Sequence, residues 1–267
     1  MQTKLLIKGK FTAGKGEEEK VLDPATGKVI VEIAEASEEQ VNAAVLAAAG
    51  AFSSWSATAP KDRATLLLKL ADRIEAEADG FAELESRNCG KPLAAVKNDE
   101  IPAIADVFRF FAGAARTVTG AISGEYLPGF TSMIRRDPVG VVASIAPWNY
   151  PLMMAAWKLS PAVAAGNTVV LKPSEQTPLT ALKLAEIVAE LFPPGVINII
   201  TGRGKSVGAP LVSHPAVRMI SLTGDVSTGE RILQAAAKGV KRTHLELGGK
   251  APVIVFDDAD LKSVVSG

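Results

Sequence analysis

The segment His244-Leu245-Glu246-Leu247-Gly248-Gly249-Lys250 places a carboxylate between two leucines, directly before a pair of glycines. The pattern predicts that Glu246 lies at the end of a buried, apolar strand. Burial disfavours the charged form of a carboxyl group and raises its pKa toward the range of a general base. Glu246 is therefore the first candidate catalytic residue.

A second candidate is Asn149, in the turn Pro147-Trp148-Asn149-Tyr150-Pro151. The two prolines stiffen this turn and hold the side-chain amide of Asn149 in one place. A preorganised amide donor stabilises a developing oxyanion, and its loss costs on the order of 3 kcal/mol of transition-state stabilisation. The alternative is that Asn149 only caps the helix that follows, which is a common role of asparagine.

The turn Lys172-Pro173-Ser174-Glu175 has residue types that suit a dinucleotide. A carboxylate after a strand accepts hydrogen bonds from both hydroxyls of a ribose. The same carboxylate would repel a 2′-phosphate, so Glu175 favours NAD over NADP. The alternative is a solvated ion pair of Lys172 with Glu175, with Ser174 or Thr177 as a cap.

Two glycine-containing segments resemble phosphate loops. Thr223-Gly224-Asp225-Val226-Ser227-Thr228-Gly229 lies at a predicted strand–helix junction, where backbone amides suit a pyrophosphate. Asp225 weakens this interpretation, because a capping carboxylate competes with the phosphate for the same amides. The segment from Gly202 to Gly208 has the spacing GxGxxxG, and Ile199 stands where a P-loop has its first glycine. ATP or GTP hydrolysis of the P-loop type is therefore excluded.

Composition narrows the possible partners. Lys+Arg and Asp+Glu number 29 each, so no basic surface predicts nucleic-acid binding. The longest apolar tract, 139–171, is broken by prolines, asparagines and a lysine, so no membrane span is expected. A hydrophobic fraction of 48% and a mean hydropathy of +0.21 indicate that some apolar surface meets another subunit or segment.

The cysteine and the histidines are expected to be structural. Cys89 is the only cysteine, so it has no intramolecular disulfide, and a reducing, cytoplasmic location is the default. It lies at a predicted helix end before Gly90. His214 and His244 have no cysteine or carboxylate at metal-ligand spacing, so no metal site is expected.

The elements from residue 140 onward alternate between strand and helix. Strands are predicted at 141–146, 168–171, 196–200, 218–222 and 243–247, and helices at 152–164, 178–192, 205–212 and 228–237. Apolar strands separated by helices predict an α/β fold with a Rossmann-like parallel sheet covered on both faces. Ligands of such sheets bind at the carboxyl ends of the strands, where each of the turns above lies.

The other segments are less regular. Ser37 and Gln40 form a predicted capping box for a helix that runs to about Trp55, and further helices are predicted from Pro60 and over 101–119. Residues 122–140 are predicted to form a hairpin arm that packs on a neighbouring subunit, so a homo-oligomer is expected. A strand over 252–256 and a helix start at 257–260 begin a further unit.

Taken together, the turns PWNYP, LKPSE, TG-x(4)-G and LELGGK, in this order and at these spacings, resemble the NAD(P)-dependent aldehyde dehydrogenase superfamily. The resemblance runs over essentially the whole chain. Residues 148–157 are similar to those of gamma-aminobutyraldehyde and betaine-aldehyde dehydrogenases. The resemblance implies NAD as cofactor, a small-molecule aldehyde as substrate and oxidation of that aldehyde, such as 4-aminobutanal, to the carboxylic acid.

The resemblance also implies residue roles. Asn149 stabilises the oxyanion of a thiohemiacetal, and Glu246 activates the water that hydrolyses the thioester. Tyr150 and Trp157 box a cationic amino end through cation–π contacts, with core packing as their alternative role. Lys172 and Glu175 hold the adenosine ribose, and residues 225–228 contact the pyrophosphate. The full set of implied cofactor residues is Ala146, Pro147, Trp148, Lys172, Pro173, Ser174, Glu175, Gly204, Gly224, Asp225, Val226, Ser227 and Thr228.

One element of the family pattern is absent. The family nucleophile is a cysteine farther beyond the glutamate than the 21 residues that follow Glu246, and Cys89 belongs to a different motif. Without a thiolate the covalent intermediate cannot form. We therefore expect an N-terminal portion, with an NAD-binding domain at 1–121 and 141–248, an oligomerisation hairpin at 122–140 and the start of an incomplete catalytic domain at 249–267. The alternative function is a catalytically inactive NAD-binding fragment.

Overall fold

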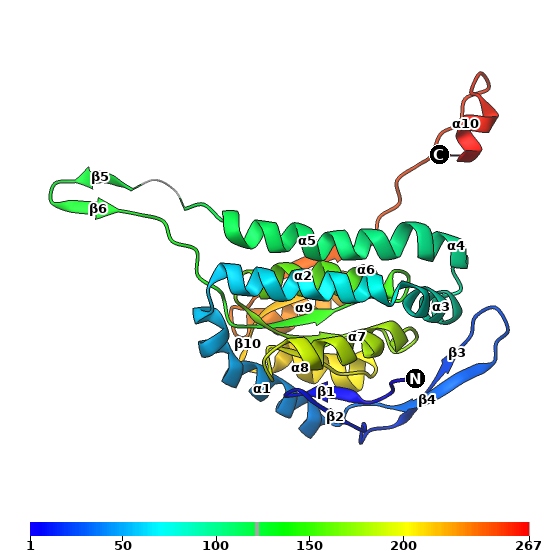
Figure 1. The fold of residues 1–267 in the computed structure, drawn as a ribbon, viewed down its shortest axis with the longest axis horizontal. Helices are drawn as coiled ribbons and strands as arrows, with labels where there is room; N and C mark the ends of the chain where they lie inside the picture. The colour runs from blue at the N-terminus through cyan, green and yellow to red at the C-terminus, as the bar shows by residue number, and fades with distance from the viewer. Residues whose placement is uncertain (121–122, 267) are drawn as a thin grey trace.

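The computed structural model describes residues 1–120 and 123–266, and its centre is one large β-sheet (Figure 1). The strands of this sheet are β1 (Leu5–Ile7), β2 (Lys10–Thr12), β7 (Val141–Ile145), β8 (Thr168–Lys172), β9 (Ile197–Ile199), β10 (Val217–Gly224) and β11 (Arg242–Leu247). They lie in the order β11-β10-β7-β8-β9-β1-β2. The strands from β7 to β11 are parallel, whereas β1 is antiparallel to both β9 and β2.

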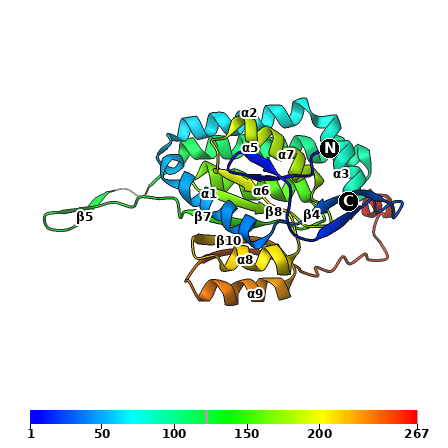
Figure 2. The same cartoon turned by 90° about the horizontal axis from the view of Figure 1, so that it is seen from below.

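Helices cover both faces of the sheet (Figure 2). One face carries α2 (Pro60–Ala76), α3 (Ala78–Cys89), α5 (Ile101–Thr117), α6 (Pro151–Ala164) and α7 (Leu179–Leu191), and the other carries α1 (Glu38–Ala57), α8 (Ala209–Ser213) and α9 (Val226–Ala237). Two hydrophobic cores result, one on each side. Successive strand residues alternate between them: Val142 packs in the first core and Ala143 in the second. The predicted α/β fold is confirmed.

The strand order places the ligand-binding edge. The chain runs from β7 through β8 to β9 in one direction and then returns to the opposite side of β7 to form β10. Such a reversal opens a crevice at the carboxyl ends of the two strands that flank it, and ligands of doubly wound sheets bind there. The turn after β7 and the end of β10 therefore border the expected binding crevice.

Most predicted helices are present with small shifts of their ends. The capping box is confirmed, because Gln40 N donates to Ser37 Oγ and Ser37 N donates to Gln40 Oε1. The predicted helix over 205–212 divides into η2 (Gly204–Gly208) and α8. Elements that were not predicted from the sequence are β1, β2, β3 (Glu18–Leu22) and β4 (Val29–Ala34), and the short pieces α4 (Leu93–Ala95) and η1 (Val96–Glu100).

The predicted hairpin arm is present and projects from the body (Figure 1). It consists of β5 (Gly124–Leu127) and β6 (Phe130–Ser132), which pair in antiparallel fashion. Its apolar side chains Tyr126, Leu127 and Phe130 are exposed. The predicted boundary between residues 121 and 122 lies outside the described residues. Residues 133–136, which also belong to the predicted arm, follow β6 as irregular backbone.

The prediction of a strand at 252–256 is wrong. This segment leaves the body and has no neighbouring strand, and a strand forms only where its backbone groups find a ladder partner (Figure 1). The helix start is confirmed, since α10 (Leu261–Ser266) follows. Within the described part of the chain, no helix combines the length and the apolar character that crossing a membrane requires.

Candidate active site

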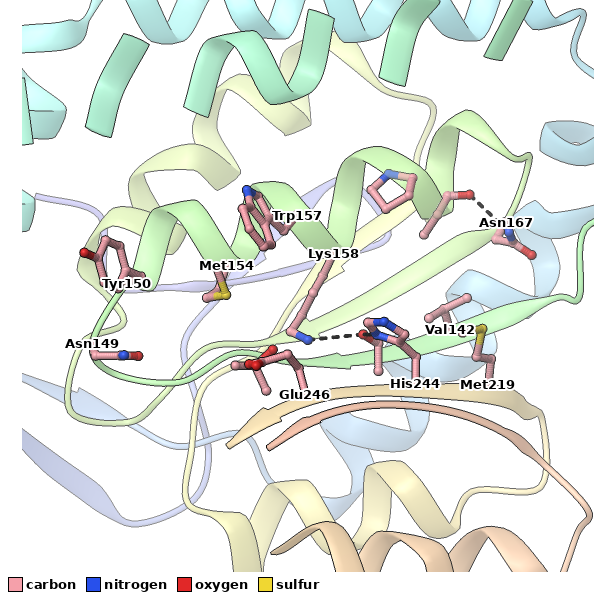
Figure 3. Close-up of a pocket in the computed structure, with 14 residues that line it drawn as sticks. Val142, Asn149, Tyr150, Met154, Trp157, Lys158, Asn167, Met219, His244 and Glu246 are labelled. Atoms are coloured by element: carbon pink, nitrogen blue, oxygen red, sulfur yellow. Dashed lines mark hydrogen bonds between the residues drawn. The ribbon is translucent and has the colours of Figure 1, made fainter. Parts of the chain in front are cut away.

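A pocket of about 700 Å³ lies between α6 and the face of β7, β10 and β11 that α6 leaves open (Figure 3). Its lining includes Asn149, Tyr150, Trp157, Lys158, Ser221 and Glu246. The two candidate catalytic residues come from distant parts of the sequence, and the parallel sheet brings them to one cavity. The pocket reaches the carboxyl ends of the strands, where the predicted cofactor turns also lie.

Asn149 does not cap the helix that follows it. The N-cap position of α6 is Tyr150, and no side chain of this turn bonds to the first-turn amides. Among the residues that the structure describes, the amide of Asn149 has no hydrogen-bond partner, and it is exposed at the pocket. The alternative role as a cap is therefore wrong, and the amide is free to donate to a ligand oxygen.

The prediction that Glu246 is buried is wrong. Along β11 the leucines turn toward α9 and are partly buried, while His244 and Glu246 turn toward the pocket and are exposed. The reason is positional: β11 is an edge strand of the sheet, and α6 covers only its inner strands. Glu246 lies on the pocket wall together with Asn149, but as a solvated carboxylate.

Lys158 is a functional candidate that sequence analysis missed. It lies on α6 and is buried, and its Nζ donates to Ser221 Oγ at 3.1 Å, which in turn lies 3.4 Å from His244 Nδ1 (Figure 3). Burial lowers the pKa of Lys158 to about 8, and the charge of Glu246 acts in the opposite direction. A single lysine inside an otherwise apolar helix was the signal that could have found it. Its amine can exchange a proton near neutral pH.

The predicted cofactor residues all lie at the carboxyl edge of the sheet. Ala146, Pro147 and Trp148 follow β7, and Lys172 ends β8 with Pro173, Ser174 and Glu175 behind it; Gly204 begins η2 after β9, Gly224 ends β10, and Asp225, Val226, Ser227 and Thr228 open α9. Because β10, β7, β8 and β9 are neighbours, these turns form one continuous edge. The structure thus places them together, and their contact with a cofactor stays a prediction.

Lys172 is held entirely by its own chain. Its buried Nζ donates to Gly202 O at 2.6 Å, to Pro173 O at 3.0 Å and to Glu175 Oε2 at 3.4 Å. An ammonium group has three donors, so all of them are used. Burial lowers the pKa of Lys172. It contacts Glu175, whose side chain is about one-third exposed (32%), and the predicted contact of both residues with a ribose stays a prediction.

Asp225 caps α9, as its position suggested. Its carboxylate accepts hydrogen bonds from Thr228 N at 2.9 Å, Ser227 Oγ at 2.7 Å and Thr228 Oγ1 at 2.7 Å. The bonds from Ser227 and Thr228 hold the pKa of Asp225 well below its usual range. The predicted cap is therefore confirmed, and competition of this carboxylate with a pyrophosphate for the Thr228 amide stays a prediction.

The aromatic side chains of the pocket are accessible. Tyr150 and Trp157 are 44% and 55% exposed, so the alternative that they pack in the core is wrong. Lys91 Nζ lies 3.3 Å from the centroid of the Tyr150 ring, which shows that this ring already carries one cation. The Cys89 thiol donates to Trp148 O at 3.4 Å and to Asn149 O at 3.5 Å, and burial raises its pKa.

The chain is similar in sequence to proteins of a known family. The model of the aldehyde dehydrogenase family matches residues 11–267. The chain is 46% identical over 245 residues to the 2-aminomuconic semialdehyde dehydrogenase of Danio rerio, covering 91% of this chain and 50% of the relative.

Solved structures agree. PnpE of Pseudomonas sp. WBC-3, solved with nicotinamide adenine dinucleotide, has a TM-score of 0.96 and 44% identity, and betaine aldehyde dehydrogenase of Staphylococcus aureus, solved with NAD⁺, has 0.95 and 38%. These matches cover 100% of this chain and 55% and 53% of those chains. The chain thus spans about half the length of the relatives it matches. By fold, site turns and family match together, the chain belongs to the aldehyde dehydrogenase family.

Proposed function

We propose that this protein binds NAD at the carboxyl edge of its sheet and takes part in the oxidation of an aldehyde to a carboxylic acid. The observation that carries the proposal is that Asn149, with a free amide, and Glu246 line one pocket beside the predicted cofactor turns. NAD held at this edge would supply the hydride acceptor for the oxidation.

The pocket residues are proposed to stabilise developing charge and to transfer protons. Asn149 donates its amide N–H to the oxygen derived from the aldehyde, where negative charge develops. Glu246 takes a proton from the water that releases the acid product. Lys158 lies close enough to Glu246 for their charges to interact, and its lowered pKa suits it to exchange that proton. The residues that would hold NAD are the turns after β7, β8, β9 and β10, with Glu175 at the ribose.

The 267 residues by themselves are proposed to bind NAD without oxidising an aldehyde. Cys89 is their only thiol, it faces backbone carbonyls, and its pKa is raised rather than lowered. A nucleophilic cysteine requires the opposite environment, one that favours the thiolate. The 267-residue chain alone therefore corresponds to the non-catalytic alternative.

An aminoaldehyde such as 4-aminobutanal is the proposed substrate. Tyr150 and Trp157 line the pocket and offer aromatic faces to a substrate cation. Since Lys91 occupies one face of Tyr150, Trp157 is expected to contribute more of this recognition. The betaine aldehyde dehydrogenase relative is named for a cationic aldehyde, which supports the same substrate class.

Assembly and location are also proposed. The exposed apolar side chains of the β5–β6 arm support packing on a second copy, hence a homo-oligomer. The single, unpaired cysteine supports a reducing compartment such as the cytoplasm.

Titration calorimetry with NAD tests the proposal. The 267-residue chain is expected to bind NAD, and Glu175→Ala is expected to weaken binding about tenfold, because charge-assisted hydrogen bonds to the ribose are lost. Glu186→Ala, an exposed acid on α7, is the matched control. With 4-aminobutanal and NAD, the chain alone is expected to produce no NADH at 340 nm. Absence of NAD binding by the unmodified chain would reject the proposed function.

A further inference from the structure

The helix that carries the active-site turn lacks a cap of its own. The first-turn amides of a helix have no partner within the helix and need an acceptor from elsewhere. In α6 the N-cap residue Tyr150 provides no side-chain bond, and Pro151 at the first position has no N–H. The first amide that needs an acceptor is therefore that of Leu152.

That acceptor comes from another helix. Leu152 N donates to Oε1 of Glu85, on α3, at 3.1 Å, and the other carboxylate oxygen of Glu85 accepts a hydrogen bond from Thr180 Oγ1, on α7. Glu85 is 1% exposed. Its carboxylate thus joins three helices at the point where the active-site turn enters α6.

Burial of the Glu85 carboxylate is energetically unfavourable. Burial raises the pKa of Glu85 to about 6, even though the bonds from Thr180 and Leu152 favour the charged form. A buried polar group is tolerated where its hydrogen bonds are made, and a costly one next to a functional site is a sign of a constraint other than stability.

The end of α3 holds the same turn through further contacts. Cys89 donates to the carbonyls of Trp148 and Asn149, and Lys91, which is ion-paired with Glu100 at 2.6 Å, lies over the ring of Tyr150. The backbone and neighbours of Asn149 are thus fixed from one side. Its side-chain amide has no hydrogen bond among the described residues.

Asparagine is a preferred capping residue, and Asn149 precedes the N-cap residue Tyr150 by one position. If Asn149 were the N-cap, Leu152 would be the third residue of the helix, and its N–H is the donor that a capping side chain accepts. Glu85 already accepts that hydrogen bond. In the absence of Glu85, Asn149 would be the alternative acceptor for this amide.

We propose that Glu85 is a positioning residue: by capping α6 from α3, it releases the Asn149 amide from capping and leaves it directed into the pocket. The purpose of this arrangement rests on the proposed function, because a free amide matters only if it binds the substrate oxygen. The capping inference itself stands on the hydrogen bonds alone and is testable without NAD or an aldehyde.

The test is amide hydrogen exchange of the 267-residue chain followed by NMR. In the unmodified chain and in Asn149→Ala, the Leu152 N–H is expected to be equally protected, because Glu85 caps it. In Glu85→Leu the signals of the Asn149 side-chain amide are expected to shift as that side chain takes over the cap. In the double variant, Leu152 protection is expected to fall about tenfold or more, since both acceptors are gone.

Three comparisons make the result specific. Glu85→Gln keeps an acceptor for Leu152 and is expected to retain the unmodified Asn149 signals. Glu83→Leu changes an exposed acid of the same helix and is expected to leave both reporters unchanged. Met154 N–H, bonded to Tyr150 O at 2.9 Å, reports general fraying of α6.

The outcomes that overturn the inference are equally defined. Faster exchange at Leu152 in Asn149→Ala alone, in a variant whose exposed site is not expected to affect folding, would show that Asn149 is already the cap. Unshifted Asn149 signals in a folded Glu85→Leu variant would show that Glu85 does not control that side chain. A chain that passes these tests but binds no NAD would reject the proposed function and leave the capping inference standing.

Discussion

At the scale of single residues, Lys158 shows how the fold changes the chemistry of an ordinary side chain. The neighbouring Ala156 and Leu159 are fully buried, and α6 carries the amine of Lys158 into the interior on the same side. There its partner is the hydroxyl of Ser221, and the nearest opposing charge is Glu246 on an exposed strand. Desolvation outweighs that attraction, which is why the pKa falls to about 8.

We expect Lys158→Met to stabilise the chain at neutral pH. The pKa of Lys158 is lower in the folded state, about 8, than the ordinary lysine value of 10.5, so the unfolded state binds more protons between these values. The contribution of Lys158 to the free energy of unfolding therefore rises as the pH increases from 8 to 10.5. Below pH 8 the buried, charged lysine destabilises the folded chain. Removing it is expected to add up to about 3 kcal/mol at pH 7, less the bond to Ser221.

Urea unfolding followed by circular dichroism measures this difference. The advantage of the variant is expected to shrink as the pH rises from 8 to 10.5. Lys69→Met, which removes an exposed lysine of α2, is the control and is expected to change little at any pH. A variant that is less stable than the parent chain at pH 7 would contradict the prediction.

At the scale of elements, the site is made from helix N-termini and strand ends, and the two helices that border it are capped differently. The α9 N-terminus is capped from within by Asp225, whereas that of α6 is capped from α3 by Glu85. A carboxylate at the mouth of α9 satisfies the helix but opposes an incoming phosphate. Because Glu85 caps α6 from another helix, the side chain of Asn149 in the preceding turn makes no capping bond.

We expect Asp225→Ser to tighten NAD binding. Serine caps a helix as well as aspartate does, so α9 stays intact, while the negative charge facing the pyrophosphate is removed. Unit charges about 4 Å apart in water interact by about 1 kcal/mol, so the dissociation constant is expected to fall severalfold at low salt and less at high salt.

Calorimetric titrations at two salt concentrations give the measurement. Glu230→Gln removes the same charge from an exposed position farther along α9 and serves as the control. Unchanged affinity in Asp225→Ser, with NAD bound by the parent chain, would place the pyrophosphate away from this helix.

At the scale of the whole molecule, two features extend from the body: the β5–β6 arm and the segment that leads to α10 (Figure 1). The arm exposes Tyr126, Leu127 and Phe130, at 79%, 65% and 68%, and such a group of apolar side chains is more typical of an interface than of a free surface. The arm is therefore proposed to pack on a second copy of the protein.

We expect the double substitution Leu127→Ser and Phe130→Ser to lower the oligomeric state without unfolding the sheet. Neither side chain contributes to the two cores, so the stability of the body should change little, while the apolar contact area of the arm is lost. Light scattering after size-exclusion chromatography measures the mass. Thr131→Ser, also on the arm and exposed, is the control, and an unmodified parent chain that is monomeric at all concentrations would refute arm-mediated assembly.

Much of the fold and the identity of the candidate residues could be predicted from the sequence. Alternating apolar strands and helices after residue 140 determine a parallel sheet, because each pattern buries its apolar face in only one way. The motif turns follow the strands directly, so their place at the carboxyl edge is a local consequence of chain order. The four short strands before residue 35 were not predicted. Each has only three to six residues, which is too few for the alternation of apolar and polar residues to be recognised.

Only the tertiary structure decided what surrounds each candidate. Glu246 is exposed because β11 lies at the sheet edge, and Lys158 is buried because α6 packs on β7 and β8. Asn149 is free because Glu85, from a helix more than 60 positions earlier in the chain, takes the amide that Asn149 would cap. Burial, charge and hydrogen-bond competition depend on distant neighbours, and those neighbours are known only when the chain has folded.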